Sequence, residues 1–481
     1  MIRPAVVGSY IGKILIIIGI AMISSALWSW YYSEDVVYKI LVAALITIAS
    51  GLLLTFFSER NIELNYREGF AVVTFGWIAA CIFAALPFWL SGCFPSFTDA
   101  FFEAVSGVTT TGATVLSNIE AMPRGILFWR SLTQWLGGMG IMVLFIALIT
   151  VMGSRANQIF RAEGAGGAVK GKISPRIKET AKIFWKAYMV LSGLLLLLLY
   201  LFGMDLFDAL CHTFSTMATG GFSTKNQSIG YYSSPAIQWI IILFMFIAGT
   251  NFSLHYLAFK NRSLKNYVRN REFVLYGCIV LAASLLVLLG LAQIDAVEEK
   301  IRSSLFQVVS IITTTGFSTT DYGQWSPVSA GVLFILLFVG ASAGSTSGNV
   351  KVGRYQIMLG RTIIETKKMV HPKALIPQRY GDRLINENLV INVLQYFFLH
   401  MMLVFSGAII IGLLGVDLLT AISAAAACMG NVGPGFAGVG PAQNYALIPA
   451  AGKCILSVLM IFGRLEIYPI IVMMTSDFWK D

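Results

Sequence analysis

A short string of threonine and glycine occurs four times in this chain, and its repetition constrains the fold more than any other feature. It reads VTTTGAT at Val108–Thr114, ATGGFST at Ala218–Thr224 and TTTGFST at Thr313–Thr319, with a degenerate copy, GNVGPG, at Gly430–Gly435. The central glycines are separated by 109, 95 and 117 residues and are Gly112, Gly221, Gly316 and Gly433. This near-regular spacing indicates that the chain is built from four copies of one structural unit.

Each copy of the string lies in the same arrangement of apolar segments. A long apolar run and then a short one precede it, and another long run follows it. The long runs reach the ~20 residues that a membrane-spanning helix needs, while the short ones, of roughly 10–14 residues, indicate half-helices that enter the membrane without crossing it. The sequence therefore predicts an all-α polytopic membrane protein with four units of helix, half-helix, loop and helix, at residues 67–155, 180–262, 270–372 and 387–481.

Two further apolar runs precede the first unit, at Ile14–Leu27 and Ile40–Phe57, and predict a two-helix segment over residues 1–66. The aromatic cluster Trp28–Tyr32 lies where a signal peptide would carry small cleavage-site residues, which argues against a cleaved leader. Ten full spans and four half-spans are then predicted, and together they account for nearly the whole chain. Ala236–Phe259 and Leu447–Met474, which follow the second and fourth loops, are each predicted to be one full span.

Composition excludes several classes of protein. The chain is 57% hydrophobic and only 12% charged, whereas average usage is ~25% charged, so an ordinary soluble domain is excluded. The four histidines are scattered, and the spans carry no Ser/Lys, paired Asp or His/Glu constellation. We therefore do not expect an enzyme, and no organic cofactor is predicted for this chain.

The loops themselves have the sequence expected of a cation filter. Irregular backbone inside a membrane is tolerated only where protein buries it or where it lines a water-filled cavity. Glycine permits positive φ, so a Thr-Thr-Gly segment can aim successive carbonyls in one direction. Four such loops around one axis would replace the hydration shell of a cation with carbonyl oxygens, and the C-terminal dipole of each half-helix would face it. The predicted K⁺-binding residues are Thr110, Thr111, Gly112, Thr219, Gly220, Gly221, Thr314, Thr315, Gly316, Asn431, Val432 and Gly433.

The outer end of three half-helices carries a helix-start signal. Ser96, Asp205 and Asp417 are predicted to cap them, the first two with an aspartate three residues on. Other acidic residues at this end, such as Glu103, are expected to be solvated or to cap helices.

The four loops, in their order along the chain, resemble those of the Trk/Ktr/HKT superfamily of potassium transporters, and most closely the bacterial TrkH/TrkG type. The resemblance covers essentially the whole chain, including the two-helix N-terminal segment. It implies K⁺ and Rb⁺ uptake through a protein similar to four potassium-channel subunits joined in one polypeptide, in the inner membrane of a bacterium. It also implies a homodimer and a cytoplasmic nucleotide-binding regulatory subunit similar to TrkA. Because most loops keep only one of the two glycines of a potassium-channel filter, looser selectivity for K⁺ over Na⁺ is expected.

In the third unit, the small and polar stretch Gly340–Asn349 interrupts the span that begins at Val328. One interpretation is a helix-packing face, since Gly344 and Gly348 fit a Gly-xxx-Gly pattern. The other is a break that forms an intramembrane loop able to obstruct the pore, and the family resemblance also implies a gating loop here. The predicted gating residues are Gly340, Gly344, Ser345, Thr346, Gly348, Asn349 and Arg464.

Arg464 and Glu466 lie in an otherwise apolar span of the fourth unit. Charges there are costly in lipid and usually face a cavity or a partner. An ion pair between them is disfavoured, because residues two apart on a helix do not face each other. We expect Arg464 to lie in the inner cavity, where it would oppose cation passage and bond the gating loop.

Lys and Arg concentrate in the segments that follow the first three units. By the positive-inside rule these segments are cytoplasmic, so the loops open outward and both termini lie inside. The net charge of +10 is then mostly a topology signal, and nucleic-acid binding is the weaker alternative. The same charges can dock an acidic soluble partner or anionic membrane lipid. The glycine-rich connector Gly153–Thr180 lacks a Walker motif, and no nucleotide site is predicted in it.

Two other kinds of transporter are alternatives to a potassium pore. A carrier for an organic solute would show paired repeats and side chains shaped for its substrate, whereas the fourfold period and backbone-rich loops favour a bare ion. A cation symporter of the same fold, coupled to H⁺ or Na⁺, is an alternative that the sequence leaves open.

Overall fold

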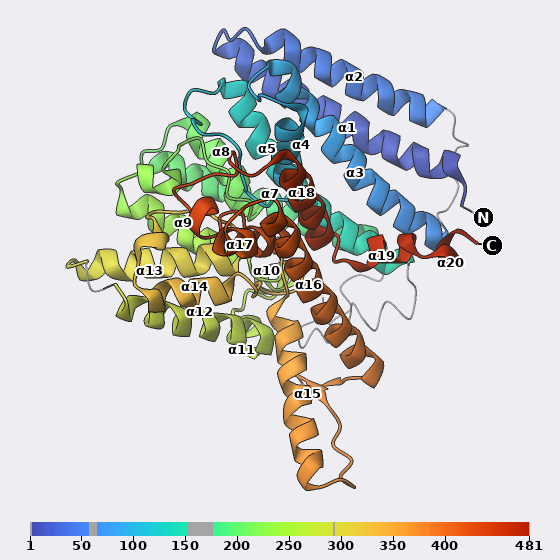
Figure 1. Cartoon of the computed structure of the whole chain (residues 1–481), viewed down its shortest axis with the longest axis vertical. Helices are drawn as coiled ribbons and strands as arrows, with labels where there is room; N and C mark the ends of the chain where they lie inside the picture. The colour runs from blue at the N-terminus through green and yellow to red at the C-terminus, as the bar shows by residue number, and fades with distance from the viewer. Residues whose placement is uncertain (1, 57–64, 152–176, 292–293, 382, 481) are drawn as a thin grey trace.

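Helices form almost all of this protein, as predicted for an all-α fold. The computed structural model describes residues 2–56, 65–151, 177–291, 294–381 and 383–480. Within those ranges the only sheet is one antiparallel hairpin, of β1 (Arg379–Tyr380) and β2 (Arg383–Leu384). The hairpin follows α15 (Val352–Val370), and Figure 1 shows this helix extending well beyond the rest of the bundle.

Six helices of the described residues are long and apolar enough to cross a membrane: α1 (Pro4–Tyr31), α2 (Val37–Phe56), α3 (Tyr66–Ser91), α7 (Ile177–Leu201), α12 (Arg271–Leu289) and α16 (Glu387–Leu413). The number rises to eight if two bent helix pairs each count as one span. Large apolar side chains such as Leu53, Leu281 and Phe398 remain more than half exposed, which fits helices surrounded by lipid rather than water. The chain is a multi-pass membrane protein.

The two N-terminal helices pack against each other through glycines. A Cβ atom on Gly12 would lie 2.5 Å from the carbonyl oxygen of Gly51, and one on Gly51 would lie 2.7 Å from that of Gly12. Small residues at such a crossing let two membrane helices approach closely, where dispersion rather than the hydrophobic effect holds them together.

The remaining helices repeat one pattern four times. After a long helix, each unit has a short one: α4 (Phe97–Val108), α8 (Leu206–Met217), α13 (Val297–Ile312) and α17 (Leu418–Met429). The helices that then return are α5 (Arg124–Val151); α9 (Pro235–Ala248) with α10 (Phe252–Asn261) and α11 (Lys265–Arg269); α14 (Pro327–Leu336) with α15; and α18 (Ala450–Arg464) with α19 (Tyr468–Met474) and α20 (Ser476–Trp479). Single 3₁₀ turns lie between loop and returning helix in the last three units: η1 (Ser228–Tyr231), η2 (Tyr322–Gln324) and η3 (Ala437–Val439).

The predicted caps of the short helices are confirmed. The Ser96 hydroxyl accepts a hydrogen bond from the Asp99 amide at 3.1 Å, and the side chains of Asp205 and Asp417 cap α8 and α17 in the same way. Each cap satisfies an amide that the helix itself leaves unbonded.

Three of the four returning helices are broken, and two of these breaks contradict the sequence prediction. Ala236–Phe259 is not one helix, because the chain bends by 97° between α9 and α10. Leu447–Met474 is not one helix either, since α18 and α19 meet at 111°. In the second case Glu466 and Ile467 both take positive φ, 57° and 65°, which ends α18. In the third unit the chain is non-helical from Leu337 to Lys351, so the predicted break in this span is confirmed and the helical Gly-xxx-Gly face is wrong.

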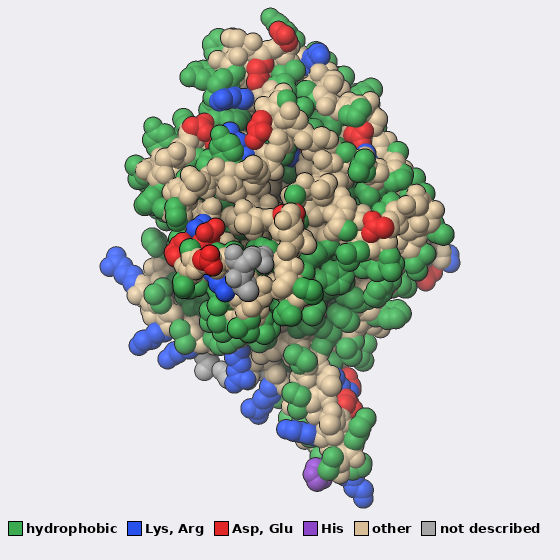
Figure 2. Space-filling view, turned by 60° about the vertical axis from the view of Figure 1, so that its left-hand side comes forward, with side chains coloured by type: hydrophobic (Ala, Val, Ile, Leu, Met, Phe, Trp, Pro, Cys, Tyr) green, Lys and Arg blue, Asp and Glu red, His purple; other side chains and the backbone are tan. Residues whose placement is uncertain are grey.

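Charged side chains are distributed unevenly over the surface. Figure 2 shows Lys and Arg gathered at the lower side of this view, on and around the protruding α15, while much of the surface above is hydrophobic. The basic residues predicted to follow the first unit, from Arg155 to Arg176, and most of the connector Gly153–Thr180 lie outside the described residues.

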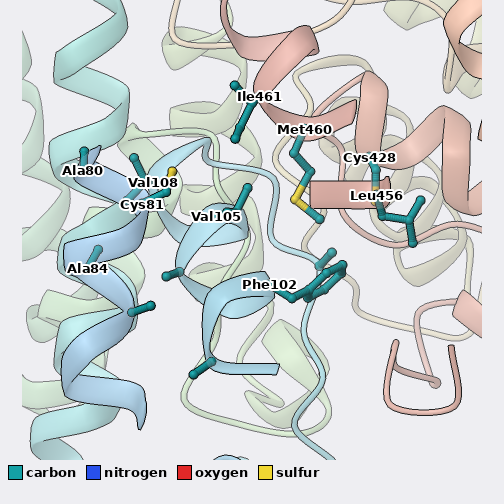
Figure 3. Packing of buried hydrophobic residues seen from close by; sticks show 14 of the residues in the cluster. Ala80, Cys81, Ala84, Phe102, Val105, Val108, Cys428, Leu456, Met460 and Ile461 are labelled. Carbon is teal, nitrogen blue, oxygen red and sulfur yellow. The ribbon is translucent and has the colours of Figure 1, made fainter. Parts of the chain in front are cut away.

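The short helix α4 lies between α3 and α18, which shows how a half-helix is buried. In Figure 3, Cys81 of α3 lies beside Val108 of α4, and both belong to one buried cluster with Val105. On the opposite side of α4, Phe102 points toward Leu456 and Met460 of α18, with Cys428 of α17 beyond. Such a helix is apolar because it packs against protein on several sides. Because protein also surrounds its end, the non-helical backbone there can lie at membrane depth.

Candidate ion-binding site

Each short helix ends in the same hydrogen-bonded turn, a Schellman motif. In the first unit the Thr111 amide donates to the Ser106 carbonyl at 2.8 Å, and the Thr110 amide donates to the Gly107 carbonyl at 3.0 Å. The bond corresponding to the first of these is also 2.8 Å in the other units, where it joins Gly220 to Ser215, Thr315 to Ser310 and Val432 to Ala427. We call residues 109–112, 218–221, 313–316 and 430–433 the Thr/Gly loops.

The four loops share a strained backbone. Thr110, Thr219, Thr314 and Asn431 have φ between 53° and 59°, and the glycines two residues later have φ between 78° and 96°. Positive φ in a β-branched residue is a genuine outlier, and such strain tends to be retained at functional sites. Left-handed residues on either side of one central residue turn successive peptide carbonyls toward one side of the loop.

The glycines bring the four loops together in a closed ring. A Cβ atom on Gly112 would lie 2.2 Å from the Gly220 carbonyl oxygen, and one on Gly221 would lie 1.9 Å from that of Thr315. One on Gly316 would lie 2.1 Å from the Val432 oxygen, and one on Gly433 would lie 2.5 Å from the Thr111 oxygen. The contacts run from loop one to two, three, four and back to one, so the four loops, which contain all twelve residues predicted for the filter, form a closed ring.

A second set of bonds closes a ring beside the loops. The Ile119 amide donates to Asn226, the Gly230 amide to Ser318, the Tyr322 hydroxyl to Gly435, and the Tyr445 amide to Thr114, all between 2.8 and 3.1 Å. Each bond joins one unit to the next. The loop conformation is therefore fixed by neighbours as well as by the helix that precedes it.

The second loop has glycine where the first and third have threonine, and Gln134 of α5 explains the difference. A Cβ atom on Gly220 would lie 2.4 Å from the Gln134 side-chain carbon. The Gln134 amide donates to the Gly220 carbonyl at 2.6 Å and accepts from the Phe222 amide at 3.1 Å. A side chain from the first unit thus occupies the place of the missing threonine.

A cavity of about 130 Å³ opens on one side of the ring and is lined by all four units, through Gly112, Gly221, Gly316 and Pro434. The charged side chains in its lining are Arg130 and Lys225. Both are paired, with Glu103 at 2.8 Å and Asp208 at 3.1 Å respectively. The positive charges beside this cavity are therefore balanced.

The ion pair of Arg130 and Glu103 is a part of the site that sequence reasoning missed. Both side chains are fully buried, so the expectation of a solvated Glu103 is wrong. Glu103 also accepts hydrogen bonds from the Thr114 hydroxyl and the Val115 amide, directly after the first Thr/Gly loop. Arg130 donates to the Ser223 carbonyl at 3.1 Å, and its guanidinium lies 4.1 Å from the Phe222 ring centre. The pair therefore joins the first two loops.

The unit-three loop, residues 337–351, lies directly against the Thr/Gly loops. The Gly348 amide donates to the Thr314 hydroxyl at 2.7 Å, and the Thr346 hydroxyl donates to the Met217 carbonyl at 3.1 Å. A Cβ atom on Gly348 would lie 2.6 Å from the Gly430 carbonyl oxygen. The loop therefore contacts the second, third and fourth units next to the ring.

Arg464 bonds the unit-three loop as the sequence predicted. Its guanidinium donates to the Thr346 carbonyl at 2.9 Å and to the Gly137 carbonyl of α5 at 3.1 Å, and it is buried. Glu466 instead pairs with Arg354 of α15 at 2.7 Å. This agrees with the argument against an Arg464–Glu466 pair.

Two more charged residues hold the unit-three loop and carried no recognisable sequence signal. The buried Glu272 carboxylate accepts from the Ala343 amide, in the middle of the loop, at 2.8 Å and from the Gly353 amide, in the first turn of α15, at 3.2 Å. The Lys351 ammonium donates to Ser347 and to the Gly348 carbonyl. Backbone groups that no helix satisfies are thus bonded by side chains.

Comparison with known proteins identifies the family. The profile of the TrkH family, described as cation transport protein, matches residues 38–480. The chain is 36% identical over 479 residues to the Trk system potassium uptake protein TrkH of Escherichia coli K12, covering 98% of both chains. This chain belongs to the TrkH family. The crystal structure of the potassium transporter TrkH from Vibrio parahaemolyticus matches it with a TM-score of 0.89 at 34% identity, over 98% of this chain and 99% of the other.

A further relative is more distant, the Trk system potassium uptake protein TrkG of E. coli K12, 29% identical over 474 residues and covering 98% of this chain and 97% of that one. The resemblance deduced from the loops is therefore confirmed. Membership of the TrkH family makes the chain an ion-transporting membrane protein and not an enzyme.

Removing the positive partner of Glu103 tests how this TrkH-family ring is held together. We expect Arg130→Met to lower the free energy of unfolding by about 3–5 kcal/mol, because an uncompensated buried carboxylate remains. Arg361, whose pair with Glu365 is partly exposed, provides the control, and Arg361→Met should cost at most about 1 kcal/mol. Unfolding of the purified variants in detergent measures both, and equal losses would contradict the assignment.

Proposed function

We propose that this protein takes up K⁺, and also Rb⁺, through a central pore whose filter is the ring of Thr/Gly loops. Its relatives are named potassium uptake proteins. The observation that carries the proposal is the closed ring, in which each glycine abuts a carbonyl of the next loop. Carbonyl rings of this kind replace the hydration shell of K⁺. The ion is the cargo, and Thr110–Gly112, Thr219–Gly221, Thr314–Gly316 and Asn431–Gly433 would coordinate it.

The unit-three loop is the proposed gate. It lies where an ion leaving the ring would pass, and Arg464 places a positive charge against it. A buried cation close to the path raises the energy of a passing K⁺. Conduction then requires the loop to move, which breaks its bonds to Thr314, Met217 and Arg464.

A cytoplasmic nucleotide-binding subunit similar to TrkA is the proposed regulator, and the transporter is proposed to be a homodimer. The protruding α15 supports a regulatory contact, because Arg354 on its first turn pairs with Glu466 beside Arg464. A pull on α15 would therefore reach both the gate and the fourth unit. The basic side chains around α15 (Figure 2) suit an acidic partner.

The proposed location is the inner membrane of a bacterium, with both termini in the cytoplasm. The concentration of Lys and Arg at the end of the bundle that carries α15 supports this orientation under the positive-inside rule (Figure 2). The cavity beside the ring then faces outward. Coupling to H⁺ or Na⁺ is the alternative, and Rb⁺ uptake into vesicles with no H⁺ or Na⁺ gradient separates the two mechanisms.

The first experiment on the filter is Rb⁺ uptake into liposomes, with competition by K⁺ and Na⁺, for the wild type and Gly316→Ser. A serine Cβ would lie 2.1 Å from the Val432 carbonyl oxygen and displace the ring. The preference for K⁺ over Na⁺ should fall about tenfold or more, as a change of ~1.4 kcal/mol in relative ion stabilisation would produce. Gly331→Ser in α14, where a Cβ meets no atom within 4 Å, is the control. A preference for K⁺ over Na⁺ that is unchanged in Gly316→Ser would mean that the filter lies elsewhere.

Replacing Arg464 by Ala should raise Rb⁺ uptake severalfold, because it removes both the charge and the bond to the Thr346 carbonyl. Arg464→Lys keeps the charge but cannot reach both carbonyls, so an intermediate rate is expected. Uptake that is unchanged or reduced in Arg464→Ala would rule out this role.

Deleting Ser345–Ser347 should also raise uptake and weaken control by the regulator. The deletion removes Thr346 with its bonds to Met217, Ala248 and Arg464, while leaving Gly348. Uptake equal to that of the wild type, in a variant that still folds by size-exclusion chromatography, would exclude the loop as the gate.

A further inference from the structure

A cavity of about 1010 Å³ lies among α7, α9, α10, α11 and α12, and none of its lining residues belongs to the Thr/Gly loops or to the unit-three loop. Its lining is mainly apolar, from residues such as Ala187, Leu191, Phe246, Ile247 and Phe273. Lys186 supplies the charge in the lining. The volume is at the upper end of the range for sites that hold a drug-sized ligand, roughly 300–1,000 Å³.

The helices α10 and α11 form one wall of this cavity. The 97° bend after α9 turns α10 away from the direction of α9. Phe259, Leu264 and Val268 are each more than 70% exposed, next to the exposed basic residues Lys260, Lys265 and Arg269. An amphipathic segment with aromatic and aliphatic residues beside lysine and arginine is typical of helices that lie in the membrane interface.

We propose that this cavity binds an anionic phospholipid, with an acyl chain in the apolar space and the headgroup phosphate near Lys186. The inference deepens the proposed function and rests on it, since the cavity lies at the end of α9 that the proposed orientation makes cytoplasmic. Anionic lipids occupy that leaflet, and basic pockets between transmembrane helices on that side recognise their headgroups. Charge complementarity therefore favours a lipid over a second copy of this basic chain.

The cavity wall is also the support of the proposed gate. At the break after α9, the Ser342 amide donates to the Gly249 carbonyl at 3.0 Å and the Phe252 amide donates to the Gly344 carbonyl at 3.0 Å. The Thr346 amide donates to the Ala248 carbonyl at 3.3 Å. Ile247 and Thr250, which line the cavity, lie beside these three bonds in the chain.

His255 of α10 joins this cavity wall to α9 and to α11. Its Nε2 lies 3.0 Å from the Ile247 carbonyl and its Nδ1 lies 2.7 Å from the Tyr267 hydroxyl. A neutral imidazole satisfies both contacts, because Nε2–H donates to the carbonyl while Nδ1 accepts from the hydroxyl. An acyl chain packed on His255 and Ile247 therefore stabilises the bend between α9 and α10 in the conformation that hydrogen-bonds the unit-three loop. Bound lipid holds the gate closed.

Binding is measured first, with spin-labelled phosphatidylglycerol and spin-labelled phosphatidylcholine added to the reconstituted wild type and variants. Lys186→Gln should reduce the preference for phosphatidylglycerol over phosphatidylcholine about fivefold. This corresponds to ~1 kcal/mol for one lysine near an anionic surface. Lys300→Gln, in α13 and outside the cavity lining, is its control. Ala187→Trp, which fills the cavity, should remove the tightly bound lipid signal. Leu197→Trp, on the same helix outside the cavity lining, should keep it. Equal binding of the two lipids by the wild type, or an unchanged signal in Ala187→Trp, would overturn the proposal.

Rb⁺ uptake is then compared in phosphatidylcholine vesicles with and without phosphatidylglycerol. Wild-type uptake should fall when phosphatidylglycerol is present, and uptake by Ala187→Trp should not respond to it. A rise would contradict the closed-gate assignment, because it is the effect of surface potential alone. Lipid binding without Rb⁺ uptake in any vesicle would reject the proposed function and leave the lipid site standing. A change of oligomeric state by light scattering in Ala187→Trp would show that a second copy, not lipid, fills the cavity.

Discussion

Inside a membrane, every backbone amide and carbonyl must find a partner within the protein, and the rest of this structure depends on how that constraint is met at the ends of the four short helices. The Schellman turn satisfies the amide of Thr111 and its counterparts with a carbonyl five residues back. It does so only if the preceding residue takes a left-handed conformation, which threonine resists. Burial between neighbouring units holds that conformation, so the strained loop and the fourfold packing require each other.

The charged residues follow from the same constraint. Glu103 satisfies the Val115 amide after the first loop, and its charge then requires Arg130. Glu272 and Lys351 bond amides and carbonyls of the unit-three loop that no helix can satisfy. A buried pair adds little net stability compared with apolar residues. Its use here is to fix irregular backbone in one conformation.

The repeat, the short helices and the loop in the third unit were predictable because each leaves a signal in consecutive residues. The partners of those loops were not, because Arg130 and Glu103 are 27 residues apart with no pattern connecting them. The break after α9 was missed for a different reason. Its sequence, Gly249-Thr250-Asn251, contains no proline and only three weakly polar residues within a strongly apolar run. Hydropathy identifies the apolar run correctly but does not predict the 97° bend within it. The bend is stabilised by Asn251, which caps the start of α10, and by the Gly344 carbonyl, which accepts a hydrogen bond from the Phe252 amide.

Three returning helices break, and their breaks contact one another. The unit-three loop bonds Gly249 at the second-unit break and Arg464 at the end of α18. Arg354, at the start of α15, pairs with Glu466 in the fourth-unit break. A force on α15 therefore acts at once on the loop and on α18, while a change at the α9–α10 break acts on the loop from the opposite side. The fourfold repeat builds the ring, and the departures from fourfold symmetry provide the means to control it.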